Sequence, residues 1–177
     1  MTPELVRVVV VLEYSLLLVF PAAMALAAML DLFTMTIPNR ISLFLVGSFL
    51  FVAPLTGMSW EQFGVHLLVF VCVLVFGFAL FAFGIVGGGD AKLLAAAALW
   101  IGYSDFFVYV TTAAIFGAVL SLVMIAYRTI LPPSWLLTQD WAMRLHRKGE
   151  GVPYGIALCC GALWVFPSTG WFLSVAV

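Results

Sequence analysis

The chain has 177 residues, of which 66% are hydrophobic and 8% are charged, and its net charge is −1. A soluble domain carries about 45–50% apolar and about 25% charged residues, so this composition excludes water as the main solvent and predicts a membrane protein. No long basic or acidic run is present, which argues against nucleic acid as a partner. The three cysteines form no C-x-x-C pair, so we expect neither a metal site nor a cofactor.

Six apolar stretches are candidate transmembrane helices, since a spanning helix needs about 20 apolar residues. In chain order they cover residues 5–30, 41–56, 64–84, 91–102, 106–127 and 154–176. The fourth is the shortest, about 18 Å long at 1.5 Å per residue. We therefore predict an all-α, polytopic membrane protein with six transmembrane helices, which form a single membrane-embedded domain over residues 1–177.

Positive charge gathers on one side of this predicted topology. Six of the seven Lys and Arg residues fall in the loops of that side, namely Arg40, Lys92, Arg128, Arg144, Arg147 and Lys148. The positive-inside rule places these loops in the cytoplasm and both termini outside. We therefore expect an integral protein of the cytoplasmic (inner) membrane.

The longest cytoplasmic loop, residues 129–152, contains a predicted helix. Leu137, Trp141 and Leu145 follow one another at a spacing of four, next to several basic residues. This pattern is typical of a helix that lies on an anionic membrane surface. The alternative is a solvated loop with two anchoring tryptophans.

Two aspartates lie at the cytoplasmic ends of predicted helices. Asp31 ends the first helix, and Asp90 follows Gly87-Gly88-Gly89 and opens the fourth. Because two helices intervene, both carboxyl groups return to the same side of the membrane. An ionisable residue near membrane depth is costly and is therefore a candidate functional residue. Two facing carboxylates can share one proton, so that one acts as a base on water and the other as an acid toward a carbonyl.

The glycine run predicts a surface without side chains beside Asp90. Glycine adopts positive φ and permits close backbone approach, so a substrate strand could lie along this surface. Each polar residue also has a structural interpretation. Asp90 is a plausible helix N-cap, Asn39 after Pro38 is a cap or turn residue of the second helix, and Asp31 marks a membrane boundary.

Three segments resemble the prepilin peptidase family, specifically its short branch that serves tight-adherence and related type IV pili. They are Asp31 with residues 36–39 (TIPN), residues 87–92 (GGGDAK) and residues 152–155 (VPYG). The second segment matches the family's G-x-G-D signature, which presenilin-like intramembrane proteases share more loosely. The resemblance covers nearly the whole chain.

The resemblance implies a membrane aspartic endopeptidase without a cofactor, which removes the basic leader of prepilins at the cytoplasmic membrane face. Its expected partners are a prepilin with a class III-type signal peptide and membrane lipid. Asp31 and Asp90 match the catalytic pair. The supporting or substrate-binding candidates are Pro38, Asn39, Gly87, Gly88, Gly89 and Lys92. Lys92 matches a lysine of the family that would orient the pair, bind substrate or contact a lipid phosphate.

Longer members of the family carry a cytoplasmic insertion with paired C-x-x-C motifs and N-methylate the new pilin terminus. Here the loop between the first two predicted helices, residues 31–40, is too short for a domain and contains no cysteine. We therefore expect no methyltransferase activity.

Two other functions are compatible with the same residues. One is a transporter or channel subunit whose acidic pair binds a cation; internal repeats or interrupted helices in matching halves would indicate it, and neither is found. The other is a pilus assembly scaffold whose aspartates only cap helices. The scaffold predicts that Asp→Asn changes are silent, because asparagine caps as well as aspartate.

Overall fold

A computed structural model describes residues 17–147, 149–170 and 172–173. Over these residues the protein is all-helical and has no β-strand. The helices are α2 (Val19–Thr34), α3 (Asn39–Leu55), α4 (Trp60–Ala82), α5 (Gly88–Ile101), α6 (Tyr103–Tyr127), α7 (Ser134–Leu137), α8 (Asp140–His146) and α9 (Gly155–Val165), followed by the 3-10 turn η1 (Phe166–Ser168).

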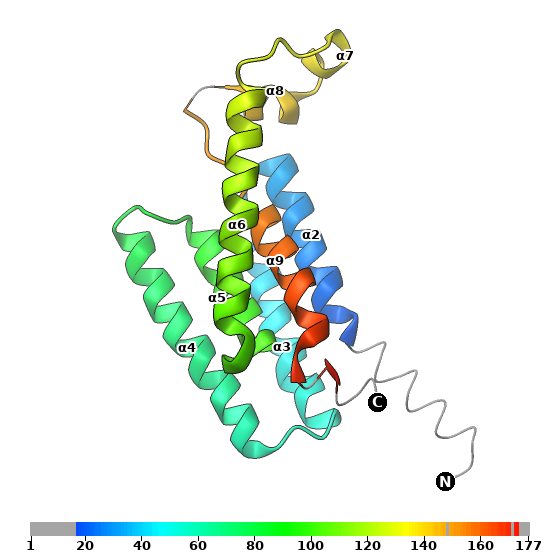
Figure 1. Ribbon diagram of the computed structural model, residues 1–177, viewed down its shortest axis with the longest axis vertical. Helices are drawn as coiled ribbons and strands as arrows, with labels where there is room; N and C mark the ends of the chain where they lie inside the picture. The colour runs from blue at the N-terminus through cyan, green and yellow to red at the C-terminus, as the bar shows by residue number, and fades with distance from the viewer. Residues whose placement is uncertain (1–16, 148, 171, 174–177) are drawn as a thin grey trace, which may run out of the picture.

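Helices α5 and α9 form the centre of the bundle (Figure 1). Helix α5 packs against α3 and α4, while α9 packs against α2 and α6. The small residues of α5 explain its central place, since Ala95, Ala96, Ala97 and Ala98 are all fully buried and let neighbouring helices approach closely.

An aromatic cluster around Trp100 joins α5 to α2, α3 and η1. The indole of Trp100 on α5 is fully buried, and its Nε1 donates a hydrogen bond to the Leu45 carbonyl of α3 at 2.9 Å. Its ring stacks on Phe20 of α2, with ring centroids 5.3 Å apart, and meets Phe166 edge-on. The cluster therefore links the first, middle and last described parts of the chain.

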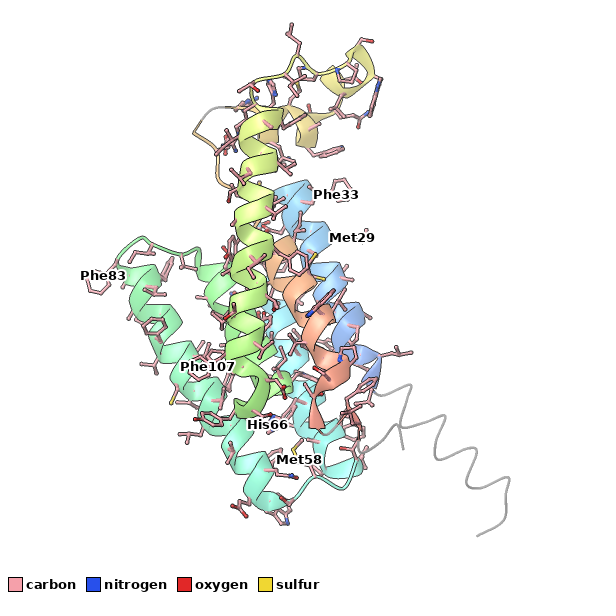
Figure 2. All side chains as sticks on the ribbon, in the orientation of Figure 1. Met29, Phe33, Met58, His66, Phe83 and Phe107 are labelled. Atoms are coloured by element: carbon pink, nitrogen blue, oxygen red, sulfur yellow. The ribbon has the colours of Figure 1, made fainter. Side chains whose placement is uncertain are left out.

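The outer surface is strongly apolar. Helix α4 exposes large side chains along its length, and Figure 2 shows Phe83, which is 80% exposed, projecting outward just beyond its end. Helices α4, with 23 residues, and α6, with 25, are long and apolar enough to cross a membrane. Helices α2, α3 and α9 are shorter, and α5 has only 14 residues, so six transmembrane helices remain a prediction.

Several predicted boundaries differ from the observed ones. Helix α2 continues past Asp31 to Thr34, so Asp31 lies inside the last turn and does not end the helix. The last helix does not run unbroken to residue 176, because α9 stops at Val165 and Pro167 lies in η1. Proline lacks the N–H that an α-helix needs and clashes with the preceding turn. The start of the first predicted helix, 5–30, and the end of the last lie outside the described residues.

The loop over residues 129–152 contains two short helices in place of one. Helix α7 ends at Leu137, and α8 starts at Asp140, so Leu137 and Trp141 do not share one helix face. Trp141 meets Phe33 of α2 edge-on, with ring centroids 5.3 Å apart. The loop therefore folds back onto the end of α2, next to the candidate site.

Candidate functional site

The end of α2 positions Asp31 toward the interior of the bundle. The helix is capped by Met35, which has a left-handed φ of 54° and whose N–H donates a hydrogen bond to the Asp31 carbonyl at 2.8 Å. The Asp31 side chain is only 5% exposed, and its Oδ2 accepts a hydrogen bond from the Gly155 N–H at 2.7 Å. The first turn of α9 therefore holds the Asp31 carboxyl group in place.

Gly155 has to be glycine because of its distance from Asp31. A Cβ at position 155 would lie 2.9 Å from Asp31 Oδ2 and 3.0 Å from Asp31 Cβ. The predicted site did not include Gly155 as a functional residue. The VPYG segment at residues 152–155 was the signal that could have found it.

Asp90 lies in the first turn of α5, whose N-cap is Gly87. The interpretation of Asp90 as an N-cap is therefore wrong. A Cβ at Gly87 would lie 2.7 Å from Asp90 Oδ2, so any larger residue here would displace the Asp90 carboxyl group. The absent side chain leaves the Asp90 carboxyl group free to face the site.

The three glycines allow close packing around the start of α5. The expectation that they adopt positive φ is wrong, since none of them does. A Cβ on Gly88 would lie 3.2 Å from the Phe81 ring, and a Cβ on Gly89 would lie 3.2 Å from Ile37 Cβ. Gly89 thus lets the start of α5 touch the segment that follows Asp31. This contact brings the two aspartate-bearing segments together.

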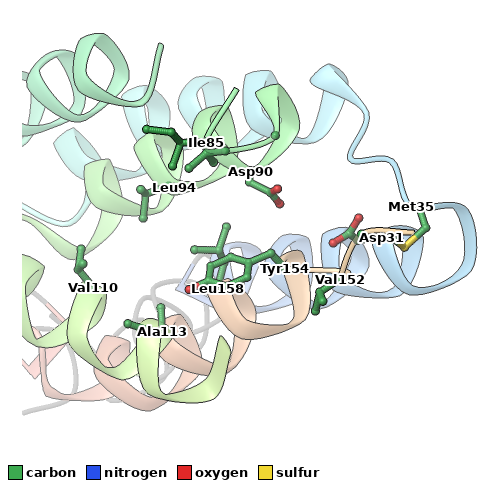
Figure 3. A pocket seen from close by; sticks show the side chains of 14 residues that line it. Asp31, Met35, Ile85, Asp90, Leu94, Val110, Ala113, Val152, Tyr154 and Leu158 are labelled. Atoms are coloured by element: carbon green, nitrogen blue, oxygen red, sulfur yellow. The ribbon is translucent and has the colours of Figure 1, made fainter. Parts of the chain in front are cut away.

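Both carboxyl groups open into one cavity of about 680 Å³ (Figure 3). Asp31 and Asp90 enter it from different helices, and both side chains line it. Gly87 and Tyr154 also line it. The rest of the wall is largely apolar, with Ile85, Val86, Leu94, Val110, Ala113 and Leu158. The cavity therefore combines an acidic pair with walls that suit an apolar chain.

Tyr154 is a second residue that the predicted site left out. Its ring lies against Gly117 of α6, where a Cβ would overlap it. Figure 3 shows the ring pointing away from Asp31, along the cavity toward Leu158 and Ala113. Gly117 thus makes room for a side chain that shapes the cavity.

Lys92, Pro38 and Asn39 do not line this cavity. Pro38 is the N-cap of α3, and Asn39 is the first residue of that helix. Lys92 Nζ donates a hydrogen bond to Asn39 Oδ1 at 2.9 Å, and both residues line a separate hollow between α3, α4 and α5. Of the predicted site residues, Gly87 and the two aspartates line the cavity, while Asn39 and Lys92 line the separate hollow.

These features define an all-helical membrane protein with two aspartates facing one cavity. The model of the type IV leader peptidase family matches residues 18–122, more than half of the chain. The protein therefore belongs to the type IV leader peptidase family and is a protease of that kind, as its sequence predicted. The match contains both Asp31 and Asp90. Searches of curated proteins and of solved structures found no match.

Proposed function

We propose that this protein is an aspartic endopeptidase that removes the leader peptide of type IV-like prepilins at the cytoplasmic membrane face. The observation that carries the proposal is the shared cavity, into which the carboxyl groups of Asp31 and Asp90 both open. In this proposal the remaining apolar helices also span the inner membrane, and both termini lie on the side of that membrane away from the cytoplasm.

The two carboxyl groups divide the acid and base work of peptide hydrolysis between them. One, as a carboxylate, takes a proton from a water molecule while the water oxygen bonds to the scissile carbonyl carbon. The other, as a carboxylic acid, donates its proton to the carbonyl oxygen. The tetrahedral intermediate then collapses: the C–N bond breaks, the leaving nitrogen takes the proton that the first carboxyl group removed from water, and the second regains its proton from a hydroxyl of the intermediate as the new carboxyl group forms. The hydrogen bond from Gly155 limits the rotation of the Asp31 carboxyl group throughout.

The walls of the cavity suit a substrate that carries an apolar helix next to its cleavage site. Val110, Ala113 and Ala114 on α6 offer a small, apolar surface. Gly87 leaves the backbone beside Asp90 uncovered. A prepilin combines an apolar helix with a short polar leader, so its helix would lie along α6 while the extended cleavage site passes the two aspartates.

Basic residues support a cytoplasmic cleavage site. The N-terminal ends of α3 and α5, with Arg40 and Lys92, lie at the same end of the bundle as Asp31 and Asp90. Arg128 at the end of α6 donates to the Glu150 and Gly151 carbonyls, each at 2.8 Å. This charge distribution agrees with the positive-inside rule.

Cleavage of a prepilin in reconstituted vesicles tests the proposal. We expect Asp31→Asn and Asp90→Asn each to slow cleavage by about 10²–10⁴-fold, the usual contribution of a positioned acid or base. Asp105→Asn is the matched control, because Asp105 lies in the first turn of α6, outside the cavity. Normal cleavage by the first two variants would reject the proposal and favour a scaffold or transporter. Equal loss of cleavage in all three variants would point to misfolding and would remove the support for catalytic roles of Asp31 and Asp90.

A further inference from the structure

A second group of polar side chains lies outside the cavity, between α3, α4 and α5. It consists of Lys92, Asn39 and Ser42, which line a hollow of about 290 Å³ whose other walls are apolar. Lys92 reaches across from α5 to bond the side-chain oxygen of Asn39. Because Asn39 is neutral, this bond does not compensate the positive charge of Lys92.

The Ser42 hydroxyl indicates a missing partner. Ser42 is 8% exposed, and its Oγ has no hydrogen-bond partner among the described residues. Buried hydroxyl groups are nearly always hydrogen-bonded, either to protein or to a bound molecule. A buried, unpartnered hydroxyl that lines a hollow beside an ammonium group therefore indicates a polar ligand from outside the chain.

The local field favours a negatively charged ligand. Helix α3 begins at Asn39 and α5 at Gly88, and neither start has a side-chain cap. The N-terminal end of a helix carries a partial positive charge and attracts anions. The start of α3 and the Lys92 ammonium meet at this hollow, and the start of α5, at Gly88, lines the adjoining one. A phosphate group, which has several acceptor oxygens, can bond Lys92 and Ser42 together.

The apolar surroundings select a lipid over a free anion. On the other side of Lys92, a second hollow of about 440 Å³ is lined by apolar residues of α4 that include Phe78 and Phe81. Leu74 and Lys92 line both hollows. Lys92 therefore stands at the polar end of two adjoining apolar hollows, an arrangement that matches one phosphate and two acyl chains.

We propose that Lys92, Asn39 and Ser42 bind the phosphate group of an anionic phospholipid whose acyl chains fill the two hollows. Basic pockets between membrane helices suit such head groups. The site is separate from the peptidase cavity, so the proposal holds or fails independently of the proposed cleavage reaction.

Native mass spectrometry of the full chain, titrated with phosphatidylglycerol in detergent, tests this site. We expect Lys92→Gln to weaken the first lipid-binding event about tenfold, as loss of a charge-assisted hydrogen bond does. Ser42→Ala should weaken it roughly threefold, as loss of a neutral hydrogen bond does. Arg147→Gln, which removes an exposed positive charge outside both hollows, should bind as the wild type does. Diacylglycerol, which lacks the phosphate, should bind wild type and Lys92→Gln equally.

Each contrary outcome overturns the proposal. If Lys92→Gln and Arg147→Gln weaken lipid binding equally, the lipid is attracted by positive charge spread over the surface and not by a defined site. Displacement of the lipid by an equal concentration of inorganic phosphate would show a site for a free anion. Unchanged lipid binding with a raised KM for substrate in Lys92→Gln would show a site for an acidic group of the substrate. If Lys92→Gln does not fold, Lys92→Arg should retain the lipid and Ser42→Ala should still lose affinity; failure of either refutes the site.

Discussion

Replacing Gly155 with alanine tests how the Asp31 carboxyl group is positioned. The new methyl group would lie 2.9 Å from Asp31 Oδ2 and 3.0 Å from Asp31 Cβ, so the side chain of Asp31 has to move. That movement stretches the 2.7 Å hydrogen bond from the Gly155 N–H. We therefore expect the active geometry to be lost while both aspartates remain present.

The size of the effect follows from two contributions. Overpacking a close contact costs about 1–3 kcal/mol, and a hydrogen bond to a charged group contributes about 1.5–3 kcal/mol. If about 3 kcal/mol of this total raises the activation barrier, kcat falls by about a hundredfold, since each 1.36 kcal/mol is a factor of ten. The KM should change little, because the methyl group points at Asp31 and not at the apolar wall that would hold the substrate.

The assay is prepilin cleavage in vesicles, with kcat and KM determined separately. Gly47→Ala is the matched control, because a Cβ at this position of α3 meets no atom within 4 Å. Thermal unfolding in detergent shows whether each variant is folded. A folded Gly155→Ala protein with the kcat of wild type would refute the proposed role of this contact.

Three further changes test other contacts. Gly89→Ala places a methyl group 3.2 Å from Ile37 Cβ and moves the start of α5 away from the Asp31 segment, so cleavage should fall about tenfold; unchanged cleavage would contradict this. Trp100→Phe removes the indole hydrogen bond to the Leu45 carbonyl, which still accepts one from Ser48 Oγ, so it should lower the free energy of unfolding by about 0.5–1.5 kcal/mol, seen as a lower melting temperature in detergent. Arg128→Lys loses the forked contacts to residues 150 and 151, because lysine cannot reproduce guanidinium geometry. Limited proteolysis around residues 150 and 151 should become faster. A cleavage rate equal to that of wild type would show that Arg128 does not hold this segment in place.

Much of the candidate site follows from short sequence patterns. The G-x-G-D segment predicted Asp90 as a site residue, the end of an apolar stretch predicted Asp31, and both line the same cavity. The family match over residues 18–122 confirms that the resemblance was sound. Such patterns are local, so the printed sequence contains them in full.

The first and last residues of the helices were harder to predict. The predicted α5 started at residue 91 and the observed one starts at Gly88, because glycines without positive φ can join a helix when their neighbours pack closely. The helix after Tyr154 stops early at Val165. Boundaries like these depend on the tertiary contacts that stabilise each last turn.

By itself, the sequence determined the all-helical class and the family of this protein and predicted a membrane environment, since composition and motif spacing do not depend on how the chain packs. Tertiary structure alone decided which candidates meet. It placed Asp31 against the Gly155 N–H, 124 positions away along the chain. It also turned Lys92 toward Asn39, away from the peptidase cavity. The physical reason is that a contact between distant segments depends on how whole helices pack, which no local pattern of residues encodes.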